Sequence, residues 1–103
     1  MVYGIRYTAT ALEHLRGLSA RDRTTLVDAV DDQLRHEPDV PTRRRKRMRP
    51  NPVAPWELRV GDYRVFYDLE PGAEEAGEPE VVVLAIGLKT RNRIWIGGEE
   101  HEL

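Results

Sequence analysis

The 103-residue chain contains no cysteine, which excludes disulfide scaffolds, thiolate metal sites and cysteine nucleophiles. Its three histidines are scattered along the sequence, so the sequence indicates no zinc site and no cofactor. No apolar run approaches the ~20 residues that a helix needs to span a bilayer. The first eight residues lack the apolar segment of a signal peptide. These absences predict a small cytoplasmic protein without a metal, a cofactor or a membrane partner.

Lysine is scarce, and the positive charge is concentrated in one short segment. The formal net charge is −2, from 16 basic and 18 acidic residues. Without the six basic residues in 43–49 the remainder carries −8. These six are Arg43, Arg44, Arg45, Lys46, Arg47 and Arg49. A basic block on an otherwise acidic protein predicts contact with a polyanion, although a solvated loop that keeps the protein soluble is an equally good interpretation.

The pattern of apolar residues predicts a single domain, 1–103, of the α+β class. A chain of this length supports only one core. An opening strand is expected at 2–8, and N-cap residues at 8–10 and at 19 predict two helices, since Thr and Ser satisfy free backbone N–H groups. Their inward faces are expected to carry Leu12, Leu15 and Leu18 in the first helix, and Leu26, Val27, Val30 and Leu34 in the second.

The second half of the chain reads as strands. Four prolines and the basic block make 39–55 an expected loop. Strands are expected at 56–60, 63–69, 81–86 and 94–96, and the acidic tail 99–103 is expected to fray. The order of elements predicts two antiparallel helices that cover one face of a mostly antiparallel sheet.

The two-residue turn Gly61-Asp62 has the glycine-first signature of a type II′ hairpin, which fixes the strand register. With this register three apolar pairs share one face, which we expect beneath the helices. The pairs are Val60 with Tyr63, Leu58 with Val65, and Trp56 with Tyr67. The other face, expected to be open to solvent, holds Arg59 directly across from Arg64, and Glu57 across from Phe66.

Two arginines across a strand pair repel each other by up to about 1 kcal/mol, and neither can lose its proton. They need a counter-anion, which is either a carboxylate of the protein such as Glu57 or a bound phosphate. Lys89, Arg91 and Arg93 lie in a turn that can reach the same face, which favours an anion-binding concavity.

Two aromatic residues are placed to assist such a site. Phe66 shares the arginine face and Trp95 follows the basic turn. Stacking of an unpaired base on such a ring is worth ~1–3 kcal/mol. A half-buried residue of an edge strand is an equally good interpretation of Trp95.

The segment 56–68, with the sequence WELRVGDYRVFYD, resembles the core hairpin of the RelE/ParE toxins of bacterial type II toxin–antitoxin systems. The opening strand, the two helices, the strand 81–86 and the motifs GLK (87–89) and RNR (91–93) also fall where this family has them, so the resemblance covers almost the whole chain. It implies a toxin that an antitoxin neutralises. The RelE branch cleaves mRNA in the ribosomal A site without a metal, whereas the ParE branch inhibits DNA gyrase without being an enzyme. We expect the RelE-type activity on ribosome and mRNA, with gyrase inhibition as the alternative.

The resemblance also implies residue roles. Arg64 matches the arginine that contacts the scissile phosphate, and Lys89 and Trp95 fall where RelE has a catalytic arginine and a catalytic tyrosine. The chain departs from RelE at Pro55 and Glu57, which replace two catalytic lysines. Glu57 is a candidate general base, because related ribonuclease toxins use a glutamate, although pairing with the arginines is favoured. The predicted catalytic residues are Arg64, Arg59, Lys89 and Glu57. The predicted RNA-binding residues are Arg44, Arg45, Lys46, Arg47, Arg91, Arg93 and Trp95.

Overall fold

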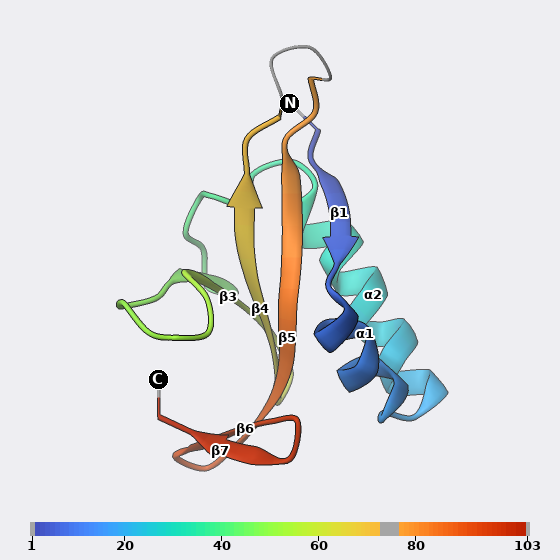
Figure 1. Ribbon diagram of the computed structural model, residues 1–103, viewed down its shortest axis with the longest axis vertical. Coiled ribbons are helices and arrows are strands. Elements are labelled where there is room, and N and C mark those ends of the chain that lie inside the picture. Colours follow the sequence, from blue (N-terminus) through green and yellow to red (C-terminus); the bar gives the residue numbers. More distant parts are fainter. Residues whose placement is uncertain (1, 73–76, 103) are drawn as a thin grey trace.

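The computed structural model describes residues 2–72 and 77–102. In this part of the chain the elements are β1 (Gly4–Tyr7), α1 (Ala9–Arg16), α2 (Ala20–Leu34), β2 (Arg45–Arg47), β3 (Trp56–Val60), β4 (Tyr63–Glu70), β5 (Glu80–Thr90), β6 (Arg93–Ile96) and β7 (Glu99–His101). The sheet has the order β2-β3-β4-β5-β6-β7, all antiparallel, and β1 pairs in parallel with β5 (Figure 1). The predicted α+β class is confirmed.

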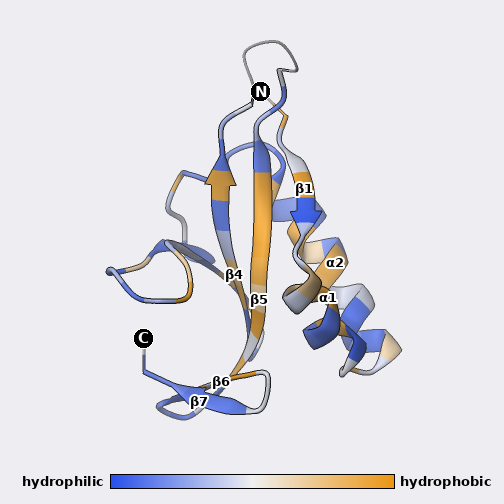
Figure 2. Cartoon of the chain, viewed as in Figure 1, coloured by the Kyte–Doolittle hydropathy of each residue, from blue (hydrophilic) through white to orange (hydrophobic). Residues whose placement is uncertain are grey.

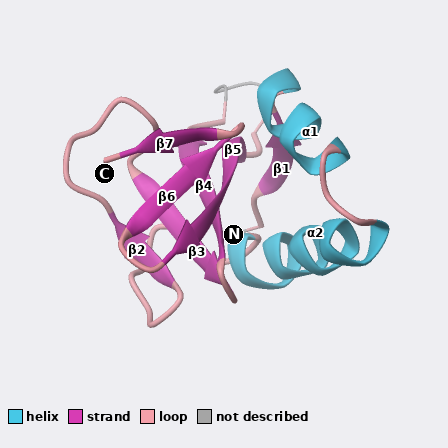
Figure 3. Ribbon diagram, turned by 90° about the horizontal axis from the view of Figure 1, so that it is seen from below, coloured by secondary structure: helices cyan, strands magenta, loops and turns pink. Residues whose placement is uncertain are grey.

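Both helices begin at side-chain caps. The Thr8 hydroxyl accepts a hydrogen bond from the Ala11 N–H at 3.1 Å, and the Ser19 hydroxyl accepts one from the Asp22 N–H at 3.1 Å. These bonds satisfy N–H groups that the first helical turn leaves without a backbone partner. The chain reverses between the helices, and both lie on the same side of the sheet (Figure 3).

The helices cover the sheet face that the hairpin register predicted. The buried side chains of this core are Ala11, Leu15, Leu26, Val30, Leu34, Trp56, Leu58, Val65, Tyr67, Val81, Val83 and Ile86. Gly61 has φ of +59°, as the first residue of a type II′ turn requires, and all five predicted β3–β4 pairs are present. The prediction for Leu12 was wrong: its side chain is 40% exposed, and Ala11 takes the inward position one residue earlier.

Strand β5 is the centre of the sheet. Figure 2 shows it as a continuous hydrophobic stretch, and the side chains from Val81 to Val83 are buried whichever face they point to. A small second apolar cluster covers part of the opposite face, formed by Ala54, Phe66, Ala85 and Ile96 with Met48, Val53, Leu84 and Ile94 against them. The valine-rich segment is therefore the buried central strand that its composition predicted.

Two segments expected to be irregular are strands. Arg45–Arg47 of the basic block forms β2, an edge strand on β3, and Glu99–His101 forms β7, which pairs with β6. Charged residues are common on edge strands because they discourage pairing with other chains. Gly97 and Gly98 both have positive φ, +60° and +82°, the conformation of a type I′ hairpin turn. The expectation that the tail frays was therefore wrong for Glu99–His101.

No helix in the described ranges is long and apolar enough to cross a membrane.

Candidate functional site

Strand pairing lines up charged residues on the sheet face away from the helices. One row joins Lys46 to Glu57 across β2 and β3. Another places Arg59 opposite Arg64 across β3 and β4. A third joins Lys89, Ile94 and His101 across β5, β6 and β7. Because side chains alternate along each strand, all these rows face the same side.

A concavity of about 590 Å³ lies on this face, which we call the cationic pocket. Its lining carries six cations and three carboxylates, in contrast to the net charge of −2 for the whole chain. The residues are Lys46, Arg47, Met48, Arg49, Glu57, Arg59, Lys89, Asn92, Arg93, Ile94, Glu100, His101 and Glu102. Such a surface attracts a polyanion, because its walls are protein and its excess charge is positive.

Two of the pocket's cations have carboxylate partners. Arg59 Nε lies 3.6 Å from Glu57 Oε1, and Arg93 Nε lies 3.3 Å from Glu100 Oε1. Lys46, Arg49 and Lys89 make no salt bridge with the described residues. These exposed cations are therefore available to a ligand.

Arg64 is buried, contrary to the expectation that it faces solvent. Its residue is 8% exposed, and it is absent from the pocket lining. Its Nη1 donates hydrogen bonds to the Gly61 and Tyr63 carbonyls at 2.8 and 2.9 Å. Its Nε lies 2.9 Å from Glu57 Oε1 without an N–H that points at this oxygen, so the contact is an ion pair and not a hydrogen bond. The counter-anion of the arginine pair is therefore Glu57, one of the two alternatives that the sequence left open.

Comparison with known proteins supports the predicted fold and family resemblance. No family model and no curated protein matches the sequence. Among solved structures, the fold is similar to a chain in the crystal structure of the toxin–antitoxin complex RelBE2 from Mycobacterium tuberculosis. The two are 27% identical with a TM-score of 0.65, and the match covers 86% of this chain and all of the other. The chain belongs to the RelE/ParE toxin superfamily.

Five of the predicted site residues line the cationic pocket. Glu57, Arg59 and Lys89 were predicted as catalytic, and Lys46 and Arg93 as RNA-binding. Arg47 is also in the pocket wall, but it pairs with Trp56, whose side chain is on the helix side of the sheet. Its guanidinium carbon lies 5.6 Å from the centre of the Trp56 ring, a cation–π contact, so the charge of Arg47 is directed to that side.

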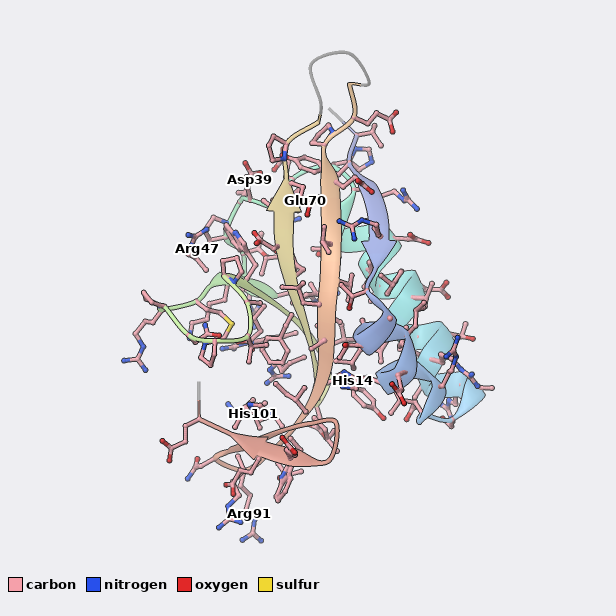
Figure 4. The ribbon with its side chains drawn as sticks, viewed as in Figure 1. His14, Asp39, Arg47, Glu70, Arg91 and His101 are labelled. Carbon is pink, nitrogen blue, oxygen red and sulfur yellow. The ribbon has the colours of Figure 1, made fainter. Side chains whose placement is uncertain are left out.

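Other predicted residues lie outside the pocket. Arg45 Nη1 donates to the Gln33 carbonyl at 2.7 Å and its Nε to the Val40 carbonyl at 3.0 Å, so Arg45 fastens the end of α2 to the following loop. Arg44 is exposed beside the hairpin tip. Arg91 is at the tip of the β5–β6 turn and points away from the fold (Figure 4).

The two aromatic residues are not in the pocket. Phe66 is fully buried under Gly87, where an added Cβ would come within 2.9 Å of its ring, so the expectation of a stacking surface there was wrong. Trp95 lines a groove of about 630 Å³ on the helix side of the sheet, with Leu18, Leu88 and His14. Its Nε1 donates to the Thr90 hydroxyl at 3.1 Å. Trp95 is half-buried, and it also borders a concavity at the β5–β6 turn with Arg91 and Arg93, so its role toward RNA stays a prediction.

Sequence reasoning missed part of the pocket wall. The residues are Met48, Arg49, Asn92, Ile94, Glu100, His101 and Glu102. The last three come from the tail that was expected to fray. Gly97-Gly98 between an apolar segment and this tail is itself a hairpin signal and identifies β7 as a strand.

His14 and three tyrosines shape the helix side of the sheet. His14 Nδ1 accepts the Ile86 N–H at 3.1 Å, on the edge of β5 between the end of its pairing with β1 and the start of its pairing with β6. Burial lowers the pKa of His14 from its ordinary value of 6.5. Burial raises the pKa of Tyr7 to about 12 and also raises that of Tyr67, whose hydroxyl donates to the Pro38 carbonyl at 2.7 Å. The hydrogen bond from Tyr63 to Asp22, 2.8 Å long, raises the pKa of Tyr63 and ties the hairpin to α2.

Proposed function

We propose that this toxin cleaves mRNA on the ribosome without a metal and so blocks translation, and that a cognate antitoxin neutralises it. The observation that carries the proposal is the cationic pocket, which gathers Arg59, Lys89 and a histidine on one sheet face. An antitoxin partner is supported by the similar chain, which was solved as a toxin–antitoxin complex. The Arg–Lys lining fits a phosphate backbone as the ligand.

Arg59 and Lys89 are suited to the phosphate chemistry. The ribose 2′-oxygen attacks the adjacent phosphorus as its hydroxyl loses a proton, the P–O5′ bond breaks, and the 5′-oxygen leaves and takes up a proton. The pentavalent phosphorane between these stages carries extra negative charge on its oxygens. Fixed cations that meet this charge lower the barrier, because they need little reorganisation during the reaction. Arg59 is in β3, next to the turn at 61–62. The backbone N–H of Lys89 in β5 donates a hydrogen bond to the Asp62 carbonyl of the same turn at 2.8 Å, so this turn fixes the backbone near both residues.

His101 is suited to move the proton. Imidazole is the side chain whose ordinary pKa lies nearest physiological pH, so it both takes and gives protons readily. His101 lies in the same row as Lys89 and faces the pocket from β7. Glu57 is a poorer general base, because its carboxylate already faces two guanidinium groups at 2.9 and 3.6 Å.

Inhibition of DNA gyrase, the ParE-type activity, is the second candidate. It is favoured by the replacement of two RelE lysines by Pro55 and Glu57, and by the position of Trp95 outside the pocket. A binding surface for a protein needs none of these catalytic groups.

Induced expression separates the two candidates. We expect labelled amino-acid incorporation to stop before labelled thymidine incorporation, and mRNA cut sites to appear on ribosomes. The double variant Arg59→Ala with Lys89→Ala should abolish both the early loss of amino-acid incorporation and the mRNA cut sites. Arg21→Ala removes an exposed charge on α2 outside the pocket and is the matched control that keeps toxicity. A block in thymidine incorporation first, with intact mRNA, contradicts the ribonuclease proposal and supports the gyrase one.

A further inference from the structure

Two tight turns of the sheet share a backbone conformation but differ in the residue that adopts it. Gly61-Asp62 joins β3 to β4, and Arg91-Asn92 joins β5 to β6, so each turn has two residues between paired strand ends. The first turn residue has a positive φ in both, +59° at Gly61 and +55° at Arg91. Among the described residues other than glycine, only Arg91 has a positive φ.

A side chain makes this backbone conformation unfavourable. The Cβ atom crowds the following carbonyl oxygen, and glycine avoids this contact because it has no Cβ. Arginine at position 91 therefore gives up stability that a glycine would provide, as Gly61 does in the other turn. Residues held in such rarely adopted conformations are concentrated at functional sites. The strain at Arg91 thus indicates a use for its side chain.

The Arg91 guanidinium is placed to meet a ligand. The residue is exposed at the tip of the β5–β6 turn, and its side chain points away from the fold (Figure 4). It makes no salt bridge with any residue in the described part of the chain. On the other side of the turn, Arg93 Nε already lies 3.3 Å from Glu100 Oε1. Arg91 therefore carries the positive charge of this turn that an anion can reach most readily.

The turn also borders a concavity that joins the cationic pocket. Its volume is about 430 Å³, and its walls are Thr90, Arg91, Asn92, Arg93 and Trp95. Asn92 and Arg93 line the cationic pocket as well, so the two concavities share a wall. The hydrogen bond from Trp95 Nε1 to the Thr90 hydroxyl links β6 to β5 beside the turn. An extended polyanion that leaves the pocket over this shared wall comes to Arg91.

We propose that Arg91 forms a second phosphate-binding subsite, at the β5–β6 turn, for the same RNA strand that binds in the cationic pocket. The strained backbone of Arg91 is retained for this contact. A guanidinium suits the role because it keeps its charge and can bind a phosphate through two parallel hydrogen bonds. The subsite adds to the contacts in the pocket and replaces none of them. The inference rests on the proposed function for its RNA ligand, whereas the strain is testable without RNA.

Two substitutions of Arg91 separate the strain from the phosphate contact. Arg91→Ala removes the guanidinium but keeps a Cβ, so its melting temperature should stay near that of the wild type. Arg91→Gly also removes the Cβ and should melt a few degrees higher than Arg91→Ala. A melting temperature of Arg91→Gly equal to or below that of Arg91→Ala shows that the turn is not strained, and overturns the proposal.

Binding of single-stranded RNA tests the contact itself. A dinucleotide is too short to occupy both concavities and is titrated by NMR, whereas a longer oligonucleotide is titrated by fluorescence anisotropy. Both variants should bind the longer RNA about tenfold or more weakly, because a charge-assisted hydrogen bond is lost. The slope of log affinity against log salt should fall by about 0.7. Binding of the dinucleotide should stay unchanged. Arg21→Ala, which removes an exposed charge on α2, is the matched control and should bind both RNAs like the wild type.

Three results would overturn the subsite although the wild type binds RNA. Unchanged binding of the longer RNA by both variants shows that Arg91 contacts no phosphate. An equal loss for the dinucleotide and the longer RNA shows that Arg91 acts inside the pocket. A loss seen only with purified ribosomes assigns the phosphate to ribosomal RNA and not to the strand in the pocket. A wild type that binds neither RNA nor ribosomes instead means that the proposed function fails, and the subsite with it.

Discussion

The two faces of the sheet are built from the same hairpin and differ in what covers them. On the helix side, Leu58, Val65 and Tyr67 are fully buried against two helices, and the Tyr67 hydroxyl has its own acceptor. On the other side a smaller apolar cluster covers only part of the sheet. The cationic pocket occupies the rest of this face, and most of the charged residues of the pocket are exposed. Neighbouring residues of one strand therefore pack in the core or line the pocket, because alternate side chains point to opposite faces.

Leu58 and Arg59 give the most direct test of this difference. Leu58→Ala should destabilise the fold by about 2–5 kcal/mol, because it leaves a cavity under the helices. Arg59→Ala, one residue along, should change the free energy of unfolding by no more than about 0.5 kcal/mol, as an exposed site usually does. Urea unfolding of both variants measures the contrast. Similar costs for the two substitutions would show that the faces are not energetically distinct.

On the pocket side, substitutions of His101 and Glu57 are expected to differ in their effect on mRNA cleavage. If His101 transfers the proton, His101→Gln should lower mRNA cleavage on ribosomes by about 10²–10⁴-fold while ribosome binding holds. Glu57→Gln should lower it only modestly, because the role of Glu57 is to pair with arginines. Single-turnover cleavage measures the effect, and melting curves serve as the folding control. The reverse order of effects would make Glu57 the base.

Two neighbours in the basic block, Arg44 and Arg45, should differ in the same way, one affecting RNA binding and the other stability. Arg45→Ala removes two hydrogen bonds to the Gln33 and Val40 carbonyls and should cost about 1 kcal/mol of stability. Arg44→Ala should leave stability unchanged and, if Arg44 contacts a phosphate, lower the salt slope of RNA binding by about 0.7. Thermal melting and binding titrations on both variants distinguish these roles. Equal loss of RNA binding without loss of stability would assign both residues to the ligand.

On the helix side, His14 should make stability depend on pH. Its pKa is lowered in the fold, so the neutral form is favoured, and its contribution is complete above the ordinary value of 6.5 and lost as the pH falls through the lowered pKa. Protonation also removes the Nδ1 acceptor of the Ile86 N–H. We expect the melting temperature to fall by a few degrees more between pH 7 and pH 5 in the wild type than in His14→Asn, whose side-chain oxygen can still accept this bond. Parallel pH profiles for the two proteins would contradict this role.

The smallest effect is expected at Trp95. Its ring lies in the helix-side groove and its N–H is bonded to Thr90, so Trp95→Ala should leave RNA affinity and its salt slope unchanged. Loss of a stacked base would instead weaken binding by ~1–3 kcal/mol. Anisotropy titrations measure the difference, and a loss of that size would place an RNA base at Trp95.

The sequence by itself determined the local structure of this toxin. Gly61-Asp62 has the composition of a two-residue turn, so it fixed the register of β3 and β4, and alternation then assigned Leu58 and Arg59 to opposite faces. Thr8 and Ser19 marked the helix starts because their hydroxyls replace missing backbone acceptors. The unbroken apolar run of β5 marked the centre of the sheet.

Only the tertiary structure decided which charged residues line the cationic pocket. Arg64 and Arg59 have the same register and chemistry, yet Arg64 is buried because Glu57 and two backbone carbonyls surround it. His101 lines the pocket because β7 pairs with β6. Trp95 is outside the pocket because side chains alternate along β6, which directs Trp95 to the helix side of the sheet. Register follows from contacts close in sequence, whereas exposure depends on every element packed nearby, including strands far apart in the sequence such as β1 and β5.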